Sequence, residues 1–482
     1  MEYLYTKLRN YMESDYYAFH MPGHKRNRRI TGAELPYGID ITEIEGFDDL
    51  HHAHGILSDC QRRAAELFGA DESHYLINGS TAGLLSAVMG TAKRGDKILM
   101  ARNCHKSVYN AVYLNGLEPV YVYPEYMPET GLNGEIRASQ VRKILDRCPG
   151  IRAVVITSPT YDGVVSDVRM IAQEVHRRNI PLILDEAHGA HFGFHSYFPE
   201  NGNRLGADIV IHSLHKTLPS LTQTALLHIN GNLVDRERVR RYLHMLQSSS
   251  PSYVLMASMD ECVRILTENG KELFSSYVDL LEDTRGKLRT MKTLKLFDPV
   301  HYDRSKILIT VPKYRGENKK FTGKQLYEIL NEKYLLQMEM ASNFYVVAMT
   351  SIADSEKGMR RLTEALLEIE GKLAKIKSNA GEYSIEEKMA ESVSDQWNEV
   401  VFLPADLDDA CMKERTRQVE IADSTGMIAT EYAYIYPPGI PAVVPGERIS
   451  EGTVWNLERY HRNGFRIEGT KAEGKIEVLV NG

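Results

Sequence analysis

A lysine with hydroxyl and imidazole neighbours follows what the sequence predicts to be a buried strand. Residues 207–212 read A-D-I-V-I-H, an apolar, β-branched run that is short for a helix and typical of a strand. Ser213, His215 and Lys216 come directly after it. Burial disfavours an ammonium and lowers the pKa of a lysine, which makes the amine usable as a nucleophile. On this segment alone, an ordinary lysine at a strand exit remains an equally open interpretation.

A second predicted strand supplies a carboxylate about thirty residues upstream. It reads P-L-I-L-D-E-A-H and ends at Asp185, with Ala187 and His188 next to it. A buried aspartate and a lysine at two strand ends are the arrangement that pyridoxal phosphate requires. The lysine forms the Schiff base, and the aspartate keeps the pyridine nitrogen protonated. We therefore predict a pyridoxal phosphate site, with Lys216 and Asp185 as its central residues.

The turn N-G-S-T-A-G at 78–83 follows a predicted strand and opens a predicted helix. Exposed backbone amides and the helix dipole favour an anion at such a position. Gly79 permits close backbone approach, while Ser80 and Thr81 add hydroxyl donors. Ser213 and His215 are expected to supply further donors to the phosphate. A strand-turn-helix connection that needs glycine only for its geometry is the alternative.

Histidines offer two further contacts with a cofactor ring. His105 follows a strand end, where a neutral imidazole would stack on a pyridinium ring, although a solvent-exposed histidine at a helix start is equally consistent. His188 is expected to lie over the cofactor or to assist proton transfer, with Ala187 packed under the ring; a satisfied loop histidine is the alternative. His51, His52 and His54 do not have the spacing of a tetrahedral site, so no metal is predicted.

Composition sets limits on the protein's class. The chain has 482 residues and a net charge of −7, without the basic patch that nucleic acid or an anionic membrane would require. Its five cysteines are scattered and contain no C-x-x-C pair, which predicts neither a disulfide framework nor a zinc site. No apolar run reaches the length of a signal peptide or a membrane span. We therefore expect a soluble, cytoplasmic protein that binds neither nucleic acid nor membrane.

The order of the predicted elements indicates three regions. Residues 1–55 predict an N-terminal arm with turns, and residues 56–295 alternate short apolar strands with helices. That alternation predicts an α/β domain with a mostly parallel sheet flanked by helices. Residues 296–482 predict a smaller C-terminal α+β domain. Ligands of such sheets lie at the carboxyl ends of the strands, which is where all the residues named above are expected.

Eight motifs in this order resemble those of the prokaryotic Orn/Lys/Arg decarboxylases, pyridoxal phosphate enzymes of the fold-type I, aspartate-aminotransferase-like class. The resemblance covers nearly the whole chain. It is to the short form of the family, without the N-terminal receiver-like domain of the long members. The motifs are F-H-M-P-G-H-K at 19–25, D-I-T-E at 40–43 with G-F-D-D-L at 46–50, N-G-S-T-A-G at 78–83, R-N-C-H-K-S at 102–107, S-P-T-Y-D-G at 158–163, D-E-A-H-G-A-H at 185–191, S-L-H-K-T at 213–217 and P-P-G-I-P-A-V-V-P-G-E at 437–447.

The resemblance implies a role for each matching residue. Lys216 is the Schiff-base lysine, Asp185 the partner of the pyridinium nitrogen and His105 the ring-stacking residue, with Gly79, Ser80, Thr81, Ser213 and His215 at the phosphate. Glu447 would meet the distal cationic group of the substrate, since a guanidinium or ammonium needs a charge-assisted partner. The family's sites lie at a dimer interface, so Ser249 and Ser250 are expected to reach the partner subunit's site in a homodimer or larger homo-oligomer.

The implied activity is decarboxylation of a basic amino acid through an external aldimine and a quinonoid. Arginine, converted to agmatine for polyamine biosynthesis, is the first expected substrate, then lysine and ornithine. Two alternatives stay open. One is another fold-type I reaction, by an aminotransferase or lyase, for which the tail offers Arg448, Arg459, Arg462 and Arg466 as carboxylate ligands. The other is a non-catalytic regulator on the same fold.

Overall fold

The structure is a computed structural model of the 482-residue chain. The described residues are 14–19, 41, 43, 47–127, 130–312, 321–376, 398–407, 416–435 and 440–480. Most of the predicted N-terminal arm, residues 377–397 and the first residues of the 437–447 motif lie outside these ranges.

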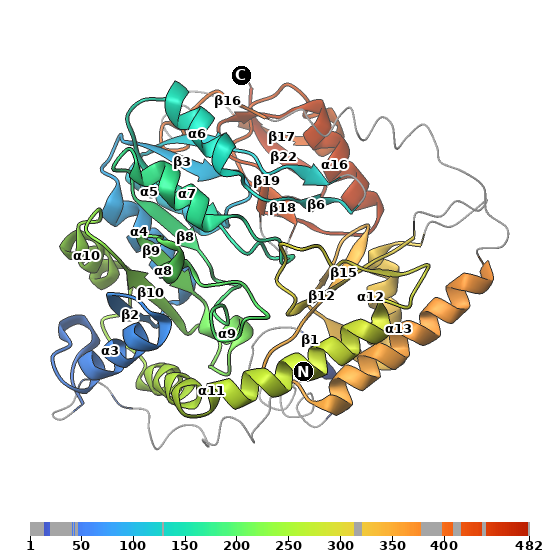
Figure 1. Ribbon diagram of the computed structural model, residues 1–482. Helices are drawn as coiled ribbons and strands as arrows, with labels where there is room; N and C mark the ends of the chain where they lie inside the picture. Colours follow the sequence, from blue (N-terminus) through green and yellow to red (C-terminus); the bar gives the residue numbers. More distant parts are fainter. Residues whose placement is uncertain are drawn as a thin grey trace.

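A seven-stranded sheet forms the centre of the large domain (Figure 1). Five neighbouring strands are parallel, and one strand, β10, runs antiparallel to both of its neighbours. In order across the sheet, the strands are β2 (Glu72–Leu76), β10 (Ala225–Ile229), β9 (Ile209–His212), β8 (Leu182–Asp185), β7 (Ile151–Thr157), β3 (Lys97–Ala101) and β4 (Glu118–Val122). The predicted α/β fold with a mostly parallel sheet is therefore confirmed.

Strand β10 is antiparallel for a simple geometric reason. It begins at Ala225, eight residues after the short helix that ends at Thr217. A parallel return to the same sheet requires a crossover of a dozen or more residues, so this connection permits only an antiparallel neighbour. The direction of β10 thus follows from the length of the loop before it.

Helices cover both faces of the sheet, which buries its central strands completely. All four residues of β8 and of β9 are buried, as expected for strands whose sequence is apolar without alternation. The helices of this domain are α3 (Ile56–Phe68), α4 (Gly79–Thr91), α5 (Lys106–Asn115), α6 (Ala138–Arg147), α7 (Val168–His176), α8 (Gly202–Leu205), α9 (Leu214–Thr217), α10 (Arg236–Leu246) and α11 (Tyr253–Leu288), with a 3-10 turn at Leu50–His52 and a small hairpin of β5 (Tyr126–Met127) and β6 (Leu132–Asn133).

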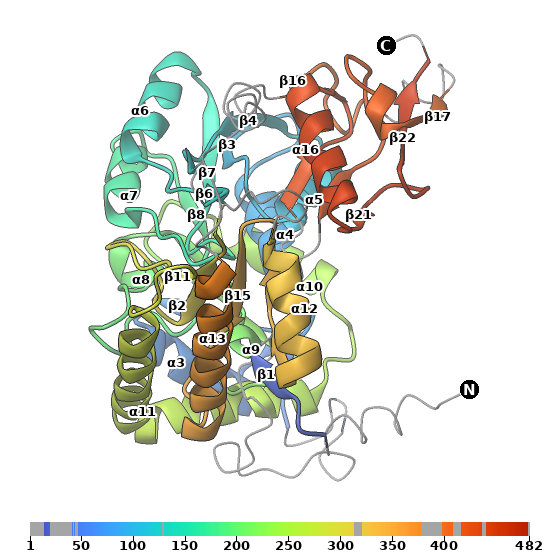
Figure 2. The same cartoon turned by 90° about the vertical axis from the view of Figure 1, so that its right-hand side faces the viewer.

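A second, four-stranded antiparallel sheet follows α11, which runs past both sheets and contacts α3 and α13 (Figures 1 and 2). This sheet shares one apolar core with α11 and the residues under the large sheet. The elements are β11 (Lys295–Leu296), β12 (Lys306–Thr310), β15 (Tyr345–Met349) and β14 (Met340–Ala341), with helices α12 (Gly323–Tyr334) and α13 (Glu356–Ile376). The N-terminal strand β1 (Tyr17–Phe19) pairs in parallel with β13 (Leu336–Met338).

The last part of the chain forms a separate small β unit beside β3 and β4, with its own apolar core (Figure 2). The residues after 295 therefore contribute to two separate units, the four-stranded sheet and this small β unit. The predicted domain bounds remain a prediction. The elements of this unit are β16 (Glu399–Val400), β17 (Thr416–Glu420), β18 (Ala433–Ile435), β19 (Ile440–Val443), β20 (Glu447–Arg448), β21 (Ile467–Glu468), β22 (Lys475–Leu479), a 3-10 turn at Ile421–Asp423 and α16 (Glu451–Arg462).

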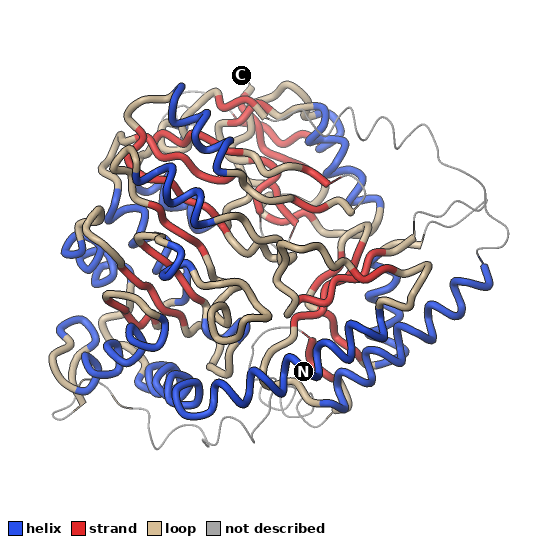
Figure 3. The backbone as a smooth tube through the Cα atoms, viewed as in Figure 1, coloured by secondary structure: helices blue, strands red, loops and turns tan. Residues whose placement is uncertain are grey.

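The architecture gathers the predicted functional residues at one edge. Strands β3, β7, β8 and β9 are parallel, so the loops that leave them emerge on the same side of the sheet, and β2 runs in the same direction (Figure 3). These loops carry the motifs that end near His105, Tyr161, Asp185 and Lys216. Within the described ranges, no helix is both long and apolar enough to cross a membrane.

Candidate active site

Lys216 lies partly buried at the carboxyl edge of the sheet, on the one-turn helix α9 that follows β9. Its Nζ is 2.9 Å from Nε2 of His188, which follows the neighbouring strand β8. Burial lowers the pKa of Lys216, and the charge of Asp185 opposes that effect. A buried amine with a lowered pKa has a larger unprotonated fraction near neutral pH, which is the form that attacks a carbonyl carbon.

Asp185 is the last residue of β8 and is 3% exposed. Its Oδ1 accepts a hydrogen bond from the backbone N–H of Ala187 at 3.2 Å. Burial raises the pKa of Asp185, while the nearby charge of Lys216 lowers it. A carboxylate in this position stabilises a protonated nitrogen placed against it, because the low dielectric strengthens their attraction. The structure thus brings together the two residues on which the sequence prediction depended.

The N-terminus of α4, where the sequence predicts an anion site, has no side-chain cap. Asn78 occupies the N-cap, but its side chain makes no capping hydrogen bond, and its Oδ1 accepts instead from the N–H of Ser248 at 3.0 Å. Gly79 has a φ of +71°, a conformation that favours glycine and allows this tight entry into the helix. The hydroxyls of Ser80 and Ser213 lie 2.5 Å apart. The first-turn amides of α4 therefore face no side-chain cap and suit a phosphate.

Two of the predicted imidazoles are held at the same edge. Nδ1 of His105 caps α5 by accepting from the N–H of Ser107 at 3.2 Å, and Ser107 in turn donates to Thr81 Oγ1 at 3.3 Å. Burial and the charge of Lys216 lower the pKa of His105 to about 3, so its ring is neutral. His215 Nδ1 lies 2.9 Å from the carbonyl of Thr224. A neutral imidazole has the right electronic character to stack on a cationic ring.

His188 connects Lys216 to groups that sequence reasoning missed. The ring of Tyr161 lies 4.6 Å from that of His188, and the hydroxyl of Tyr161 donates to Glu339. Glu339 lies between β13 and β14, and its negative charge acts on Lys216, raising that group's pKa. The buried ammonium of Lys306 donates to the backbone carbonyl of His188 at 2.9 Å. The S-P-T-Y-D-G motif contained Tyr161, but no sequence signal identified Glu339 or Lys306.

Glu447 is engaged in a buried ion pair. It is 2% exposed, and Nη2 of Arg102 donates to both of its carboxylate oxygens at 3.1 and 3.2 Å. Asn398 Nδ2 at 2.9 Å and the N–H of Val444 at 3.0 Å donate to Oε2. These contacts join the small β unit to the end of β3. The predicted contact between Glu447 and a substrate stays a prediction.

The loop after α10 carries the two serines expected at a subunit interface. Ser249 and Ser250 are exposed. The preceding residue, Ser248, contacts both Asn78 at the start of α4 and His51, whose Nε2 lies 2.8 Å from the Ser248 carbonyl. The loop therefore lies next to the anion-binding turn on an accessible face of this subunit, and its contact with a partner remains a prediction.

Comparison with known families identifies two matching regions. The Orn/Lys/Arg decarboxylase major domain matches residues 3–319, and the C-terminal domain of the same family matches residues 386–462. The first match alone covers more than half of the chain and includes every residue placed at the sheet edge.

Individual proteins show the same relationship. The arginine decarboxylase of Halalkalibacterium halodurans is 31% identical over 94% of this chain and 91% of its own length. The arginine decarboxylase of Bacillus subtilis is 30% identical over 97% of this chain and 95% of its own length. Among solved structures, the constitutive lysine decarboxylase of Escherichia coli superposes with a TM-score of 0.77 at 20% identity, covering 98% of this chain and 81% of that one. That superposition confirms the fold.

Proposed function

Because this chain belongs to the Orn/Lys/Arg decarboxylase family, and is thus an amino-acid carboxy-lyase, we propose that it converts arginine to agmatine and carbon dioxide with pyridoxal phosphate as cofactor. The choice of arginine is supported by two relatives of that name that match more than nine-tenths of the chain. Lysine and then ornithine are the next candidates. The single observation that carries the proposal is the partly buried Lys216, whose Nζ lies 2.9 Å from His188 Nε2 and whose pKa is affected by the nearby charge of Asp185.

The residues present fit pyridoxal phosphate. The uncapped start of α4, with the hydroxyls of Ser80 and Ser213, would hold the phosphate. Asp185 would accept a hydrogen bond from the ring nitrogen, and the neutral His105 would stack on the ring. Lys216 would hold the cofactor covalently. The chemistry that pyridoxal phosphate supplies when bound is an electron sink for the electron pair left at Cα when carbon dioxide departs.

The protein's own residues control the proton movements. Asp185, ionised beside the ring nitrogen, would keep that nitrogen protonated and so maintain its electron demand. After carbon dioxide leaves, Cα must receive a proton. Lys216 Nζ and His188 Nε2, 2.9 Å apart, are the two groups placed to deliver it. Lys306 donates a hydrogen bond to the backbone carbonyl of His188, which helps to hold this residue beside Lys216.

The arginines of the C-terminal region do not favour transamination. Arg448 pairs with Glu399 and donates to the carbonyl of Gly426, and Arg466 pairs with Glu468. Arg459 stacks on Phe344 and Trp455. Two of the four arginines that were considered as ligands for a substrate α-carboxylate are therefore held in ion pairs, and none of these contacts involves Lys216.

Two carboxylates are candidates for binding the distal guanidinium of arginine. The sequence resemblance favours Glu447, whereas the structure favours Glu339. Glu447 already receives donors from Arg102, Asn398 and the backbone of Val444. Glu339 is partly exposed, and its negative charge raises the pKa of Lys216. It accepts a hydrogen bond from Tyr161, whose ring contacts that of His188. We propose that Glu339, and not Glu447, binds the distal cationic group of the substrate.

A carbon dioxide release assay with a panel of amino acids tests the function. Purified protein with added pyridoxal phosphate is expected to release carbon dioxide from arginine, with an equal amount of agmatine, and more slowly or not at all from lysine, ornithine and aspartate. Release from none of the three basic amino acids would reject the decarboxylase proposal. Preference for lysine or ornithine would reject only the choice of substrate.

Replacing Glu339 with glutamine is expected to raise KM for arginine about tenfold or more, because a charge-assisted hydrogen bond to the guanidinium is lost. The melting temperature should change little, since Glu339 is partly exposed. Steady-state kinetics with arginine measure the effect. An unchanged KM would exclude Glu339 from binding the distal group.

Glu447→Gln should have the opposite pattern. It leaves the buried guanidinium of Arg102 without its counter-charge, which destabilises a protein by about 3 kcal/mol, while KM per folded enzyme should change little. Urea denaturation and kinetics on the same preparation separate the two effects. A large rise in KM without loss of stability would restore Glu447 as the substrate contact.

We further infer a homodimer in the cytoplasm. The exposed loop at Ser249 and Ser250, beside the phosphate-binding turn, supports a shared active site. Size-exclusion chromatography with light scattering should give a mass of at least twice 54.7 kDa. A monomer with full activity would contradict a shared site.

A further inference from the structure

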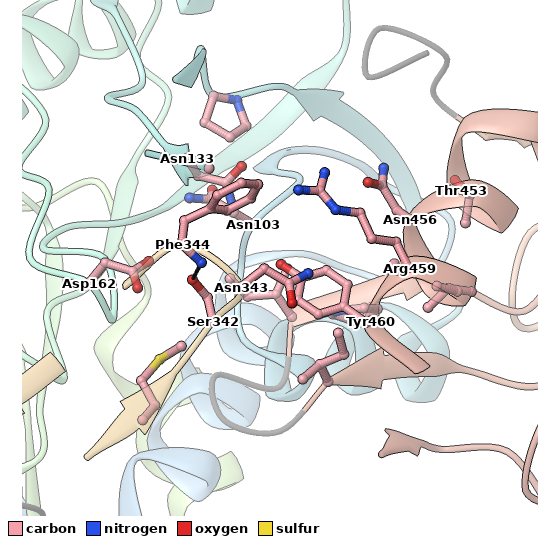
Figure 4. Close-up of a pocket in the computed structure, with 18 of the residues that line it drawn as sticks. Asn103, Asn133, Asp162, Ser342, Asn343, Phe344, Thr453, Asn456, Arg459 and Tyr460 are labelled. Atoms are coloured by element: carbon pink, nitrogen blue, oxygen red, sulfur yellow. Dashed lines mark hydrogen bonds between the residues drawn. The ribbon is translucent and has the colours of Figure 1, made fainter. Parts of the chain in front are cut away.

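A cavity of about 280 Å³ lies between the carboxyl ends of β3 and β7, the second sheet and α16. Its walls include Asn103, Asp162, Phe344 and Arg459 (Figure 4). Lys216 is not among the residues that line it. The cavity is therefore a separate space next to the catalytic groups, large enough for one small molecule.

Arg459 supplies a positive charge to this cavity. Its side chain extends from α16 into the space (Figure 4). The guanidinium carbon lies 4.6 Å from the ring centre of Phe344 and 5.1 Å from that of Trp455. Among the described residues, no carboxylate lies within ion-pairing distance of this guanidinium. Two aromatic contacts fix its orientation, so it is prepared to bind a carboxylate by a bidentate pair.

Asn103 adds an unsatisfied hydrogen-bond acceptor. The side chain is 5% exposed and lines the cavity, and its Oδ1 has no hydrogen-bond partner within the described part of the chain. Buried amide oxygens in folded proteins almost always accept a hydrogen bond. The neighbouring Arg102 is by contrast fully engaged with Glu447 and the carbonyl of Pro441. The cavity therefore presents an acceptor that requires an N–H group from a ligand.

Asp162 places a carboxylate on the other side of the same cavity (Figure 4). Its Oδ1 accepts from the hydroxyl of Tyr345 at 2.6 Å. Burial raises the pKa of Asp162 to about 6, and a cation placed against it would favour the ionised form. A guanidinium, an amide acceptor and a carboxylate thus line one space, and they complement a molecule with a carboxylate, an amine and a second cation.

We propose that this cavity binds a free basic α-amino acid, with its carboxylate on Arg459, its α-ammonium on Asn103 and its cationic side chain toward Asp162. Two wall segments continue to the catalytic groups. Asn103 lies two residues before His105, and Asp162 follows Tyr161, whose ring lies 4.6 Å from that of His188. The bound amino acid is either the substrate on its way to Lys216 or a separate effector molecule that changes the positions of His105 and Tyr161.

Binding without turnover tests the proposal independently of the proposed function. Holoenzyme is reduced with borohydride, which fixes the cofactor to its lysine and prevents reaction, and L-arginine is titrated by calorimetry. Arg459→Gln is expected to weaken one binding event per subunit at least tenfold, and Asn103→Leu to weaken the same event. Arg462→Gln, which changes an exposed arginine on the same helix, is the matched control and should bind as the parent does.

Ligand analogues give a second measurement that needs no variant. Agmatine lacks the carboxylate and citrulline lacks the side-chain cation, so both should bind the cavity at least tenfold more weakly than L-arginine. If L-arginine binds Arg459→Gln as tightly as the parent, or if agmatine and citrulline bind as well as arginine, the proposal is wrong. Chase of pre-bound labelled arginine into product during a single turnover identifies substrate in transit, while exchange without conversion identifies a separate effector.

Discussion

Lys216→Ala is expected to lower kcat for decarboxylation by about 10³-fold or more, because one substitution removes both the covalent attachment of the cofactor and a proton donor. The visible absorbance of the lysine-bound cofactor should disappear as well. Rates of carbon dioxide release and absorbance spectra, recorded on the same preparation, measure both effects. Lys216 follows β9, and its Nζ lies 2.9 Å from Nε2 of His188, whereas Lys306 contacts only the backbone carbonyl of His188.

Lys216→Arg is the matched control for this prediction. It retains a long cationic side chain at the site, but a guanidinium remains protonated and does not act as an amine nucleophile. We expect the same loss of absorbance and activity as in Lys216→Ala, with a melting temperature closer to that of the parent. If either variant keeps the visible band, a different lysine holds the cofactor.

Asp185→Asn is expected to lower kcat by about 10²-fold or more, with a smaller change in KM. The amide has nearly the same shape as the carboxyl but carries no negative charge, so it does not stabilise a protonated ring nitrogen in this buried setting. The cofactor should still bind through the start of α4 and Lys216. Steady-state kinetics and the cofactor content of the purified variant measure the effect.

Asp208→Asn serves as the matched comparison. Asp208 is also a buried aspartate beside the central strands, but it lies at the opposite edge, where it accepts from the N–H of Leu182 and contacts His176, both at 2.8 Å. This change should affect stability and leave kcat largely intact. Equal losses of kcat in the two variants would show that Asp185 acts through the fold and not through the cofactor.

The sequence predicted the α/β fold of the large domain well because that fold depends on local patterns. Buried parallel strands are short apolar runs, and their loops emerge at a common edge, so the positions of Lys216, Asp185 and the 78–83 turn follow from the chain order. The strand, turn and helix around N-G-S-T-A-G were predicted from the sequence, but the missing cap of α4 was not, because Asn78 is a residue type that usually caps a helix. Family resemblance, confirmed by the family matches, supplied the activity.

The residues that sequence reasoning missed come from long-range packing. Glu339 lies between β13 and β14, and it reaches the site through its hydrogen bond with Tyr161, which is 178 positions away in the sequence. The pairing of Arg102 with Glu447 joins residues 345 positions apart. The motif that contains Glu447 does not tell whether a substrate or an internal guanidinium is the partner of this carboxylate. The direction of β10 was likewise not predictable from the sequence of the strand itself, because it depends on the length of the loop before it.

The most direct test of the central claim is to locate the cofactor by chemistry. Holoenzyme is reduced with borohydride, digested and analysed by mass spectrometry for a phosphopyridoxyl group. We predict that this group is found on Lys216 alone, in a protein that released carbon dioxide from arginine before reduction. A phosphopyridoxyl group on another lysine, or none in an active preparation, would contradict the assignment of Lys216 and with it the site described above.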